Sequence, residues 1–280
     1  MSLLARLFRN GPPAAGPRLP AGYRLYAIGD VHGRDDLLAE LLARIDEDST
    51  QRCPVKRILL FLGDLIDRGP ASREVVERLR TLRPAGTRLV FLAGNHEEVL
   101  LRILDGNAAL IQDWLKFGGA ECLISYGADP DQLRQSEPAL AIEVVRRAIP
   151  KAHADFLRGF DDTFRAGDYL FVHAGIRPGT PLDEQAPADL RWIREPFLGD
   201  NREHGFVVVH GHTIRPQVVE RSNRIGIDTG AYRHGVLTAL GLEGDERWFL
   251  QAGTVPTGFS QALGNRADSS ALDAVSSQSG

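Results

Sequence analysis

The sequence predicts a mixed α/β (α+β) fold, and three observations lead to that class. Short apolar runs alternate with helical patterns as far as residue 104, which is typical of βαβ units with right-handed crossovers. A series of helical patterns over about 97–160 then interrupts the strands. After residue 168 short, turn-linked apolar runs return, and these are more typical of antiparallel strands.

The first half of the chain contains five predicted elements. We expect strands over 23–28, 56–62 and 88–93, and helices over 35–47 and 71–82. In the first helix, Leu37, Leu41 and Ile45 recur at helical spacing and mark a buried face. The unbroken run Ile58-Leu59-Leu60-Phe61-Leu62 favours a strand that is buried on both faces.

The rest of the chain is expected to form a helical insert and a second group of strands. The insert, which could cap the strand ends, has predicted helices over 96–104, 108–117, 138–148 and 153–160. Gly118-Gly119 is expected to end the second of these helices, and Trp114 and Phe117 are expected in the core. Strands are predicted over 169–172, 206–209, 218–220, 224–227, 235–241 and 247–250, with a proline- and acid-rich loop over 177–189.

Composition divides the chain into a flexible leader over 1–22, one domain over 23–252 and a disordered tail over 253–280.

The net charge is −4, from 33 basic and 37 acidic residues, so no basic excess favours a nucleic-acid partner. Two cysteines in unrelated contexts, Cys53 and Cys122, argue against a disulfide framework and for a reducing cytoplasm. No apolar run of about 18 residues predicts a membrane span, and the N-terminus lacks a secretory h-region.

Five separated fragments carry the chemistry, and each follows an apolar run. They are Gly29-Asp30-Val31-His32-Gly33, Gly63-Asp64-Leu65-Ile66-Asp67-Arg68-Gly69, Gly94-Asn95-His96-Glu97, His173-Ala174-Gly175 and Gly211-His212-Thr213. Repetition of strand, glycine and a metal-type ligand is hard to explain by packing alone, so we expect one two-metal site at the strand ends. The candidate ligands are two Asp, one Asn and three His: Asp30, His32, Asp64, Asn95, His173 and His212.

This ligand set favours metal-assisted phosphoryl chemistry. Mixed carboxylate and imidazole ligands suit Mn, Fe or Zn rather than calcium. Two such ions, about 3.5–4 Å apart, can activate a bridging water as hydroxide for in-line attack and clamp a phosphoryl group. Arg68 and Arg194 could bind phosphate oxygens, and His96, oriented by Asp67, could protonate the leaving group.

Together the five motifs resemble the signatures of the phosphoprotein phosphatase (PPP) branch of the calcineurin-like metallophosphoesterases. The resemblance spans about 24–250 and is greatest to the compact bacterial serine/threonine protein phosphatases. It implies a central sandwich of two mixed β-sheets flanked by helices. It also implies two divalent ions, Mn²⁺ by preference with Fe or Zn compatible, and it assigns the roles of the site residues. Asp30, His32 and Asp64 would hold one metal, Asp64, Asn95, His173 and His212 the other, with His96 and Asp67 as the acid pair and Arg68 and Arg194 on phosphate.

Three residues decide the expected subgroup. Symmetrical diadenosine tetraphosphate hydrolases of the same branch usually lack the second Asp of the second motif and have Gly-Asn-His-Asp and Gly-His-Trp. Asp67, Glu97 and Thr213 therefore favour a phosphatase that hydrolyses phosphoserine or phosphothreonine in a phosphoprotein or phosphopeptide. The alternatives are a diadenosine tetraphosphate or other nucleoside polyphosphate hydrolase, and a catalytically silent metal-binding interaction module.

Other polar residues are less well placed by the sequence. His210 lies two residues before His212, so spacing alone does not choose between them, whereas the resemblance chooses His212. Asp228 and Tyr232 are candidates for the rim of the site, with a structural turn as the alternative. The remaining histidines without ligand-type neighbours are expected to be solvated: His153, His204 and His234.

Overall fold

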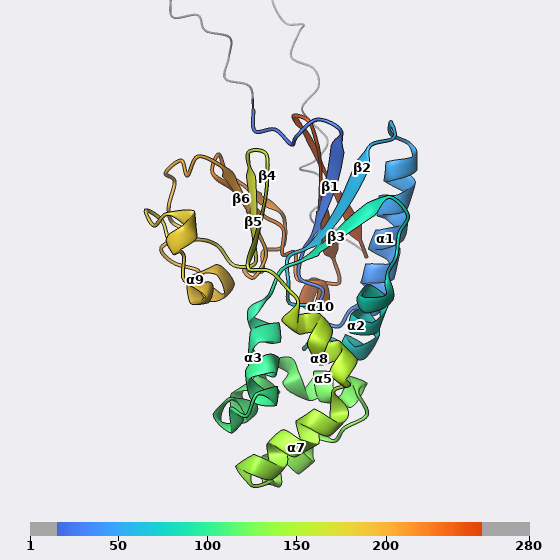
Figure 1. Ribbon diagram of the computed structural model, residues 1–280, viewed down its shortest axis with the longest axis vertical. Helices are drawn as coiled ribbons and strands as arrows, with labels where there is room; N and C mark the ends of the chain where they lie inside the picture. The colour runs from blue at the N-terminus through green and yellow to red at the C-terminus, as the bar shows by residue number, and fades with distance from the viewer. Residues whose placement is uncertain (1–15, 254–280) are drawn as a thin grey trace, which may run out of the picture.

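Two five-stranded mixed sheets face each other at the centre of the molecule (Figure 1), in a computed structural model that describes residues 16–253. The first sheet has the order β10-β9-β1-β2-β3, from β1 (Tyr23–Ile28), β2 (Lys56–Phe61), β3 (Thr87–Phe91), β9 (Leu237–Glu243) and β10 (Glu246–Ala252). The second has the order β4-β5-β6-β8-β7, from β4 (Thr163–Ala166), β5 (Tyr169–Val172), β6 (Val207–His210), β7 (Val219–Glu220) and β8 (Arg224–Gly226). The strands β1, β2 and β3 are parallel, as are β5, β6 and β8. The predicted sandwich of two mixed sheets is confirmed.

The core between the sheets follows from side-chain alternation along the strands. Leu25 and Ala27 of β1 point into it and share one cluster with Phe171 and Val209 of the second sheet. The intervening residue Tyr26 instead packs on the other face, among the helices. Both faces of the first sheet are therefore buried, as the unbroken apolar run of β2 predicts.

Helices cover the outer face of each sheet. The helices α1 (Asp35–Thr50) and α2 (Ser72–Thr81) lie along the first sheet (Figure 1), where the patterns at 35–47 and 71–82 predict them. The short helix α9 (Pro187–Trp192) covers the second sheet, because Leu190 packs with Leu170 and Val208. α9 begins inside the stretch expected to be a loop, and a single buried apolar residue over six positions gives no recognisable period.

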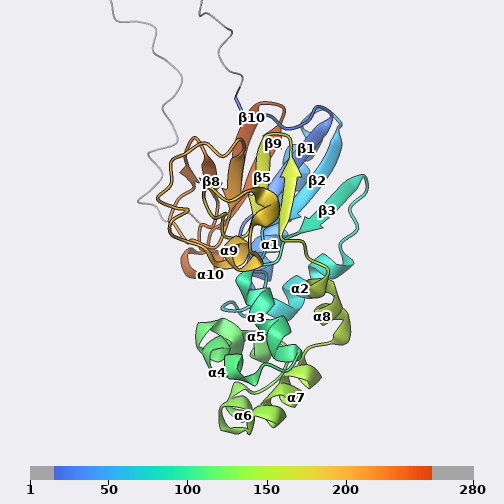
Figure 2. The same ribbon diagram turned by 60° about the vertical axis from the view of Figure 1, so that its left-hand side comes forward.

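The helical insert lies beyond the carboxyl ends of the strands, below them in Figures 1 and 2. It consists of α3 (Asn95–Leu104), α4 (Ile111–Trp114), α5 (Ala120–Ser125), α6 (Pro130–Gln135), α7 (Pro138–Ala148) and α8 (Lys151–Arg158), with a 3₁₀ turn over Ala108–Leu110. After α8 the chain returns to the edge of the first sheet, where the backbone of Asp161 bonds to Phe91 at 3.0 Å and to Ala93 at 2.8 Å. The insert therefore leaves and rejoins the sheet at the end of β3.

The helix over 108–117 does not end at Gly118-Gly119 as expected. A π-helical turn over Leu115–Gly119 joins α4 directly to α5, and Gly118 takes φ = 113° within it. Glycine adopts positive φ at no steric cost, so the pair bends the helix where the sequence suggests a break. Phe117 is 63% exposed and not in the core, whereas Trp114 is buried.

Residues 16–22, which precede β1, run across the top of the sheets in Figure 1. Leu19 is buried and donates its backbone N–H to Gly244 at 2.8 Å, and the N–H of Arg18 bonds to Asp168 at 2.9 Å. Residues 1–15 of the predicted leader and 254–280 of the predicted tail lie outside the described residues. Among the helices of residues 16–253, none combines the length and apolarity needed to cross a membrane.

Candidate active site

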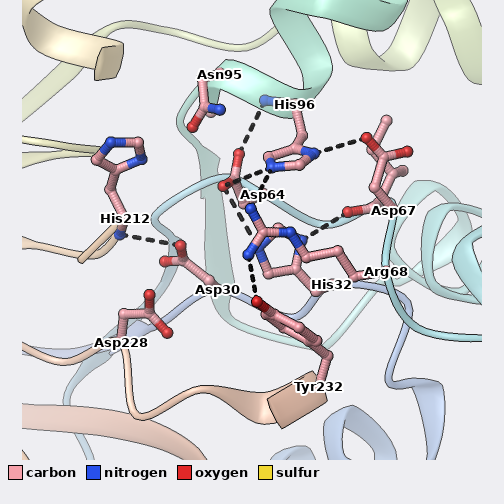
Figure 3. Close-up of polar contacts among 12 residues, drawn as sticks. Asp30, His32, Asp64, Asp67, Arg68, Asn95, His96, His212, Asp228 and Tyr232 are labelled. Carbon is pink, nitrogen blue, oxygen red and sulfur yellow. Dashed lines mark hydrogen bonds and ion pairs between the residues drawn. The ribbon is translucent and has the colours of Figure 1, made fainter. Parts of the chain in front are cut away.

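The candidate ligands meet where the parallel strands of both sheets end. Asp30, Asp64 and Asn95 follow β1, β2 and β3, while His173 and His212 follow β5 and β6. Because the carboxyl ends of parallel strands share one edge, these distant segments of the sequence converge there (Figure 3). All six candidate ligands, His32 included, are buried.

Asp64 lies at the centre of the cluster. Its Oδ2 is 3.5 Å from His32 Nε2 and 3.4 Å from His173 Nε2. Two groups of three potential ligand atoms, each within 4.8 Å of one another, share this carboxylate: His32, Asp64 and His96, and Asp64, His173 and His212. Asp64 thus has the position of a ligand that two ions share.

Backbone carbonyls orient two of the imidazoles. His32 Nδ1 lies 2.8 Å from the carbonyl of Ile66, and His173 Nδ1 lies 2.7 Å from the carbonyl of Leu62. A carbonyl only accepts, so each Nδ1 carries a proton, which leaves each Nε2 on the side of Asp64 as the nitrogen that can coordinate an ion. This arrangement is the usual second interaction of a metal-binding histidine.

Two buried polar atoms of the cluster lack a hydrogen-bond partner within residues 16–253. They are Asp30 Oδ1 and His212 Nε2, although Asp30 Oδ2 accepts the backbone N–H of His212 at 2.9 Å. Asn95 Oδ1 lies 3.1 Å from His173 Nε2. Buried polar atoms normally have hydrogen-bond partners. Two unpaired acceptors among carboxylate and imidazole groups therefore indicate that these side chains can act as metal ligands.

The electrostatics of the cluster also fit cations. Burial lowers the pKa of His32 to about 3 and that of His212 to about 2, so both are neutral and able to coordinate near pH 7. Burial opposes charge on His173 as well, but Asp64 outweighs it and raises the pKa of His173 to about 10. The pKa of Asp30 is raised by burial and by Asp228, whose carboxylate lies beside it (Figure 3). The buried carboxylates therefore need compensating positive charge.

The predicted acid pair is in direct contact. His96 Nδ1 lies 2.7 Å from Asp67 Oδ2, and the backbone N–H of His96 bonds to Asp64 Oδ1 at 3.0 Å. Burial lowers the pKa of His96, but the carboxylates of Asp64 and Asp67 outweigh this effect and the net shift is upward. Asp67 Oδ2 also accepts from Trp114 Nε1 at 3.0 Å, a contact that the sequence did not reveal because Trp114 reads as a core residue.

The two predicted phosphate-binding arginines line one cavity of about 440 Å³ beside the cluster. Arg68 Nη1 donates to the hydroxyl of Tyr232 at 2.6 Å, and its Nη2 lies 3.1 Å from His96 Nε2. Arg194 is exposed on the opposite segment, after α9. Tyr232 thus contacts Arg68, and its ring also packs edge-on against the candidate ligand His32 at 5.2 Å.

Backbone strain is concentrated at the site. Within the described chain, five non-glycine residues have positive φ, and all are site candidates: His32, Asp64, Asp67, Arg68 and His212. Such residues cost of order 1–3 kcal/mol each, so the surrounding contacts must hold them. One of these contacts explains the glycine before Asn95, because a Cβ at Gly94 would overlap Asp64 Oδ1.

Of the histidines outside the predicted ligand set, His210 lies as expected and His153 does not. His210 turns away from the cluster, since its ring packs edge-on against Phe197 at 5.2 Å, so the structure places His212 and not His210 with the ligands. His153 was expected to be solvated but is buried, with Tyr126 at 2.8 Å and Glu77 at 3.0 Å. His153 belongs to α8 of the insert, and its burial depends on contacts with residues that are distant in sequence.

Solved structures resemble the chain in fold. One is a candidate diadenosine tetraphosphatase, 21% identical with a TM-score of 0.58, covering 86% of this chain and 96% of its own. Another is a mutant of a cold-active protein tyrosine phosphatase, 18% identical with a TM-score of 0.53, covering 84% and 83%.

Curated relatives are closer in sequence. The asymmetrical bis(5'-nucleosyl)-tetraphosphatase of Bacillus velezensis is 30% identical over 76% of this chain and 86% of the relative. The symmetrical bis(5'-nucleosyl)-tetraphosphatase of Dechloromonas aromatica is 31% identical over 83% of this chain and 96% of the relative.

The expectation of a phosphoserine/phosphothreonine phosphatase is wrong, because these relatives are named tetraphosphatases. The residues that favoured it lie outside the lining of the active-site cavity. Asp67 and Glu97 are fully buried, and Glu97 accepts the backbone N–H groups of Asp64, Leu65 and Gly94. None of Asp67, Glu97 and Thr213 lines the cavity.

The resemblance at the level of the wider family is confirmed. The model of the calcineurin-like phosphoesterases matches residues 23–240, from β1 into β9, and so includes every candidate ligand. The chain belongs to the calcineurin-like phosphoesterase family.

Proposed function

We propose that the chain is a metal-dependent hydrolase of bis(5'-nucleosyl) tetraphosphates such as diadenosine tetraphosphate. The observation that carries the proposal is the set of relatives with that activity in their names, which match most of the chain. The site supports it, because one cavity joins metal-type ligands, two arginines and an apolar wall. The phosphates of such a substrate would lie against the ligands and arginines, and a nucleoside would lie against the apolar wall.

The metallophosphoesterase fold implies divalent ions, and the donor set suits Mn²⁺, with Fe or Zn also compatible. In the proposed arrangement Asp30, His32 and Asp64 hold one ion, and Asp64, Asn95, His173 and His212 hold the other. When bound, the pair activates water and withdraws charge from a phosphoryl oxygen.

The reaction adds water to one phosphorus and breaks a bridging P–O bond, so the departing phosphate oxygen gains negative charge. His96 Nε2 faces the cavity, while its Nδ1 is held by Asp67 at 2.7 Å. The upward pKa shift of His96 favours the protonated imidazole, which can donate Nε2–H to that oxygen.

Arg68 and Arg194 would bind the phosphate chain from two sides of the cavity. Tyr232 holds the Arg68 side chain in place, because its hydroxyl accepts a hydrogen bond from Arg68 Nη1 at 2.6 Å. Arg68 Nη2 and His96 Nε2 lie 3.1 Å apart, so one anionic phosphate oxygen could accept from both groups.

The test compares substrates and metals on the purified chain. Protein stripped with a chelator is assayed with Mn²⁺, Zn²⁺ or no metal on diadenosine tetraphosphate and on a phosphoserine peptide at equal concentration. We expect metal-dependent turnover with a clear preference for the dinucleotide, and chromatography of the products would show whether cleavage is symmetrical. Absence of metal-dependent turnover of the dinucleotide, or a preference for the peptide, would refute the proposal.

A further inference from the structure

Two exposed aromatic side chains, Phe117 and Trp192, line the active-site cavity. Phe117 is 63% exposed and Trp192 is 41% exposed, and they come from the insert and from α9, on separate segments of the chain. Both share the cavity with the two arginines and with the apolar Val99 and Leu110. Single exposed apolar residues are common on proteins, but a group of them beside buried ligands marks a binding surface.

The backbone ties Phe117 to one phosphate-binding arginine. Phe117 lies in the π-turn before Gly118, whose φ of 113° turns the chain. The carbonyl of Gly118 accepts the backbone N–H of Arg68 at 3.0 Å. The turn that carries the Phe117 ring therefore also holds the backbone nitrogen of Arg68.

A side-chain contact fixes Trp192 near the other arginine. Its Nε1 donates to Glu98 Oε2 at 3.1 Å, and the same oxygen lies 3.4 Å from Arg191 Nη1. Glu98 belongs to α3, so the contact ties α9 to the insert beside the site. Arg194 follows Trp192 by two residues.

We propose that Phe117 and Trp192 bind a nucleobase of the dinucleoside polyphosphate, and that they set the preference for nucleotides over bare phosphate esters. This inference rests on the proposed function. A base offers a flat π face to an aromatic ring, and loss of one such stacking partner costs about 5- to 100-fold in binding. The bond between Gly118 and Arg68, and the position of Trp192 two residues before Arg194, keep the base subsite close to the phosphate subsite.

The experiment measures steady-state kinetics of Phe117→Ala and Trp192→Ala on diadenosine tetraphosphate in the metal-loaded enzyme. We expect each variant to raise KM by roughly 5- to 100-fold with kcat near that of the unmodified chain. The Ki of inorganic tripolyphosphate, a competitor with no base, should stay unchanged. Trp192→Phe keeps an aromatic ring but loses the bond to Glu98, so it should recover only part of the loss in KM.

Matched controls come from the same insert. Ile124 and Leu140 are 60% and 54% exposed and lie outside the cavity, so Ile124→Ala and Leu140→Ala should leave KM unchanged. Unchanged KM in both aromatic variants, or an equal rise in the Ki of tripolyphosphate, would overturn the base subsite while leaving the proposed function intact. No turnover of the dinucleotide by the unmodified chain would instead overturn the proposed function, and this inference with it.

Discussion

The indole nitrogen of Trp114 donates to Asp67 Oδ2 at 3.0 Å, the same oxygen that lies 2.7 Å from His96 Nδ1. Two donors on one buried carboxylate oxygen fix the carboxylate, and the carboxylate fixes the imidazole. Trp114 belongs to α4, so the helical insert supports the proposed proton donor directly. The insert is thus part of the site as well as a cover for the strand ends.

The change Trp114→Phe should lower kcat on diadenosine tetraphosphate by about 10- to 100-fold, because a hydrogen bond to a charged group contributes roughly 1.5–3 kcal/mol. Trp114 also lines the cavity, but phenylalanine keeps an aromatic ring there, so KM should change little. Steady-state kinetics separate the two constants.

The control is Trp248→Phe. Trp248 Nε1 donates to Asp48 Oδ2 at 3.2 Å, a contact of the same kind between β10 and α1 and outside the cavity. It should lower Tm without a specific fall in kcat. Equal losses of kcat in the two variants would show that Trp114 acts through stability alone.

Removal of the proposed proton donor should show a dependence on the leaving group. His96→Asn should lower kcat by about 10²–10⁴ for an alkyl phosphate, the usual range for a general acid. An aryl phosphate with an acidic phenol needs no proton, so its loss should be much smaller. The measurement is kcat for a pair of such esters with unmodified and variant enzyme, and identical losses on both esters would contradict the acid role.

Glu97 tests whether the third motif specifies the substrate. Its carboxylate accepts from the backbone of Asp64 at 2.8 Å, Leu65 at 2.8 Å and Gly94 at 3.0 Å, and the side chain is fully buried. The shorter Glu97→Asp should weaken these bonds and cost about 1–3 kcal/mol of unfolding free energy. The ratio of kcat/KM for dinucleotide over phosphopeptide should stay the same, and a change of tenfold or more in that ratio would give the residue a role in specificity.

The strand ends and the ligand types were predictable because both are local in sequence. An apolar run followed by glycine and Asp64, or by glycine and Asn95, places the ligand at the carboxyl end of a strand. This prediction needs no knowledge of how the other segments fold. The choice of His212 over His210 needed the resemblance, because alternation puts both on one side of a straight strand. In the structure, φ = 60° at His212 redirects the chain after β6.

The cavity walls were not predictable, because they depend on contacts between distant segments. Trp192 meets Glu98 across 94 residues, and Trp114 meets Asp67 across 47. Phe117 has the periodicity of a core residue, yet the π-turn exposes it. The motifs are local and so predicted the family, whereas the walls of the cavity, which contain Phe117 and Trp192, are assembled only by the fold.

Gly118→Ala should disturb Arg68 and the phosphate subsite. A Cβ on Gly118 would lie 2.5 Å from both Cγ and the backbone nitrogen of Arg68. Backbone atoms cannot yield cheaply, so the turn must shift and carry Arg68 with it. We expect a loss of unfolding free energy of about 2–4 kcal/mol, from left-handed strain and overpacking together, and a rise in KM for the dinucleotide.

Gly106→Ala separates the steric effect from the strain. Gly106 has the same φ of 113°, but a Cβ there would meet nothing within 4 Å. Gly106→Ala should therefore lose only about 1–2 kcal/mol of unfolding free energy, from backbone strain, and should leave KM unchanged. Thermal unfolding and steady-state kinetics on both variants decide the point. If Gly106→Ala raises KM as much as Gly118→Ala does, the contact between Gly118 and Arg68 does not position the arginine.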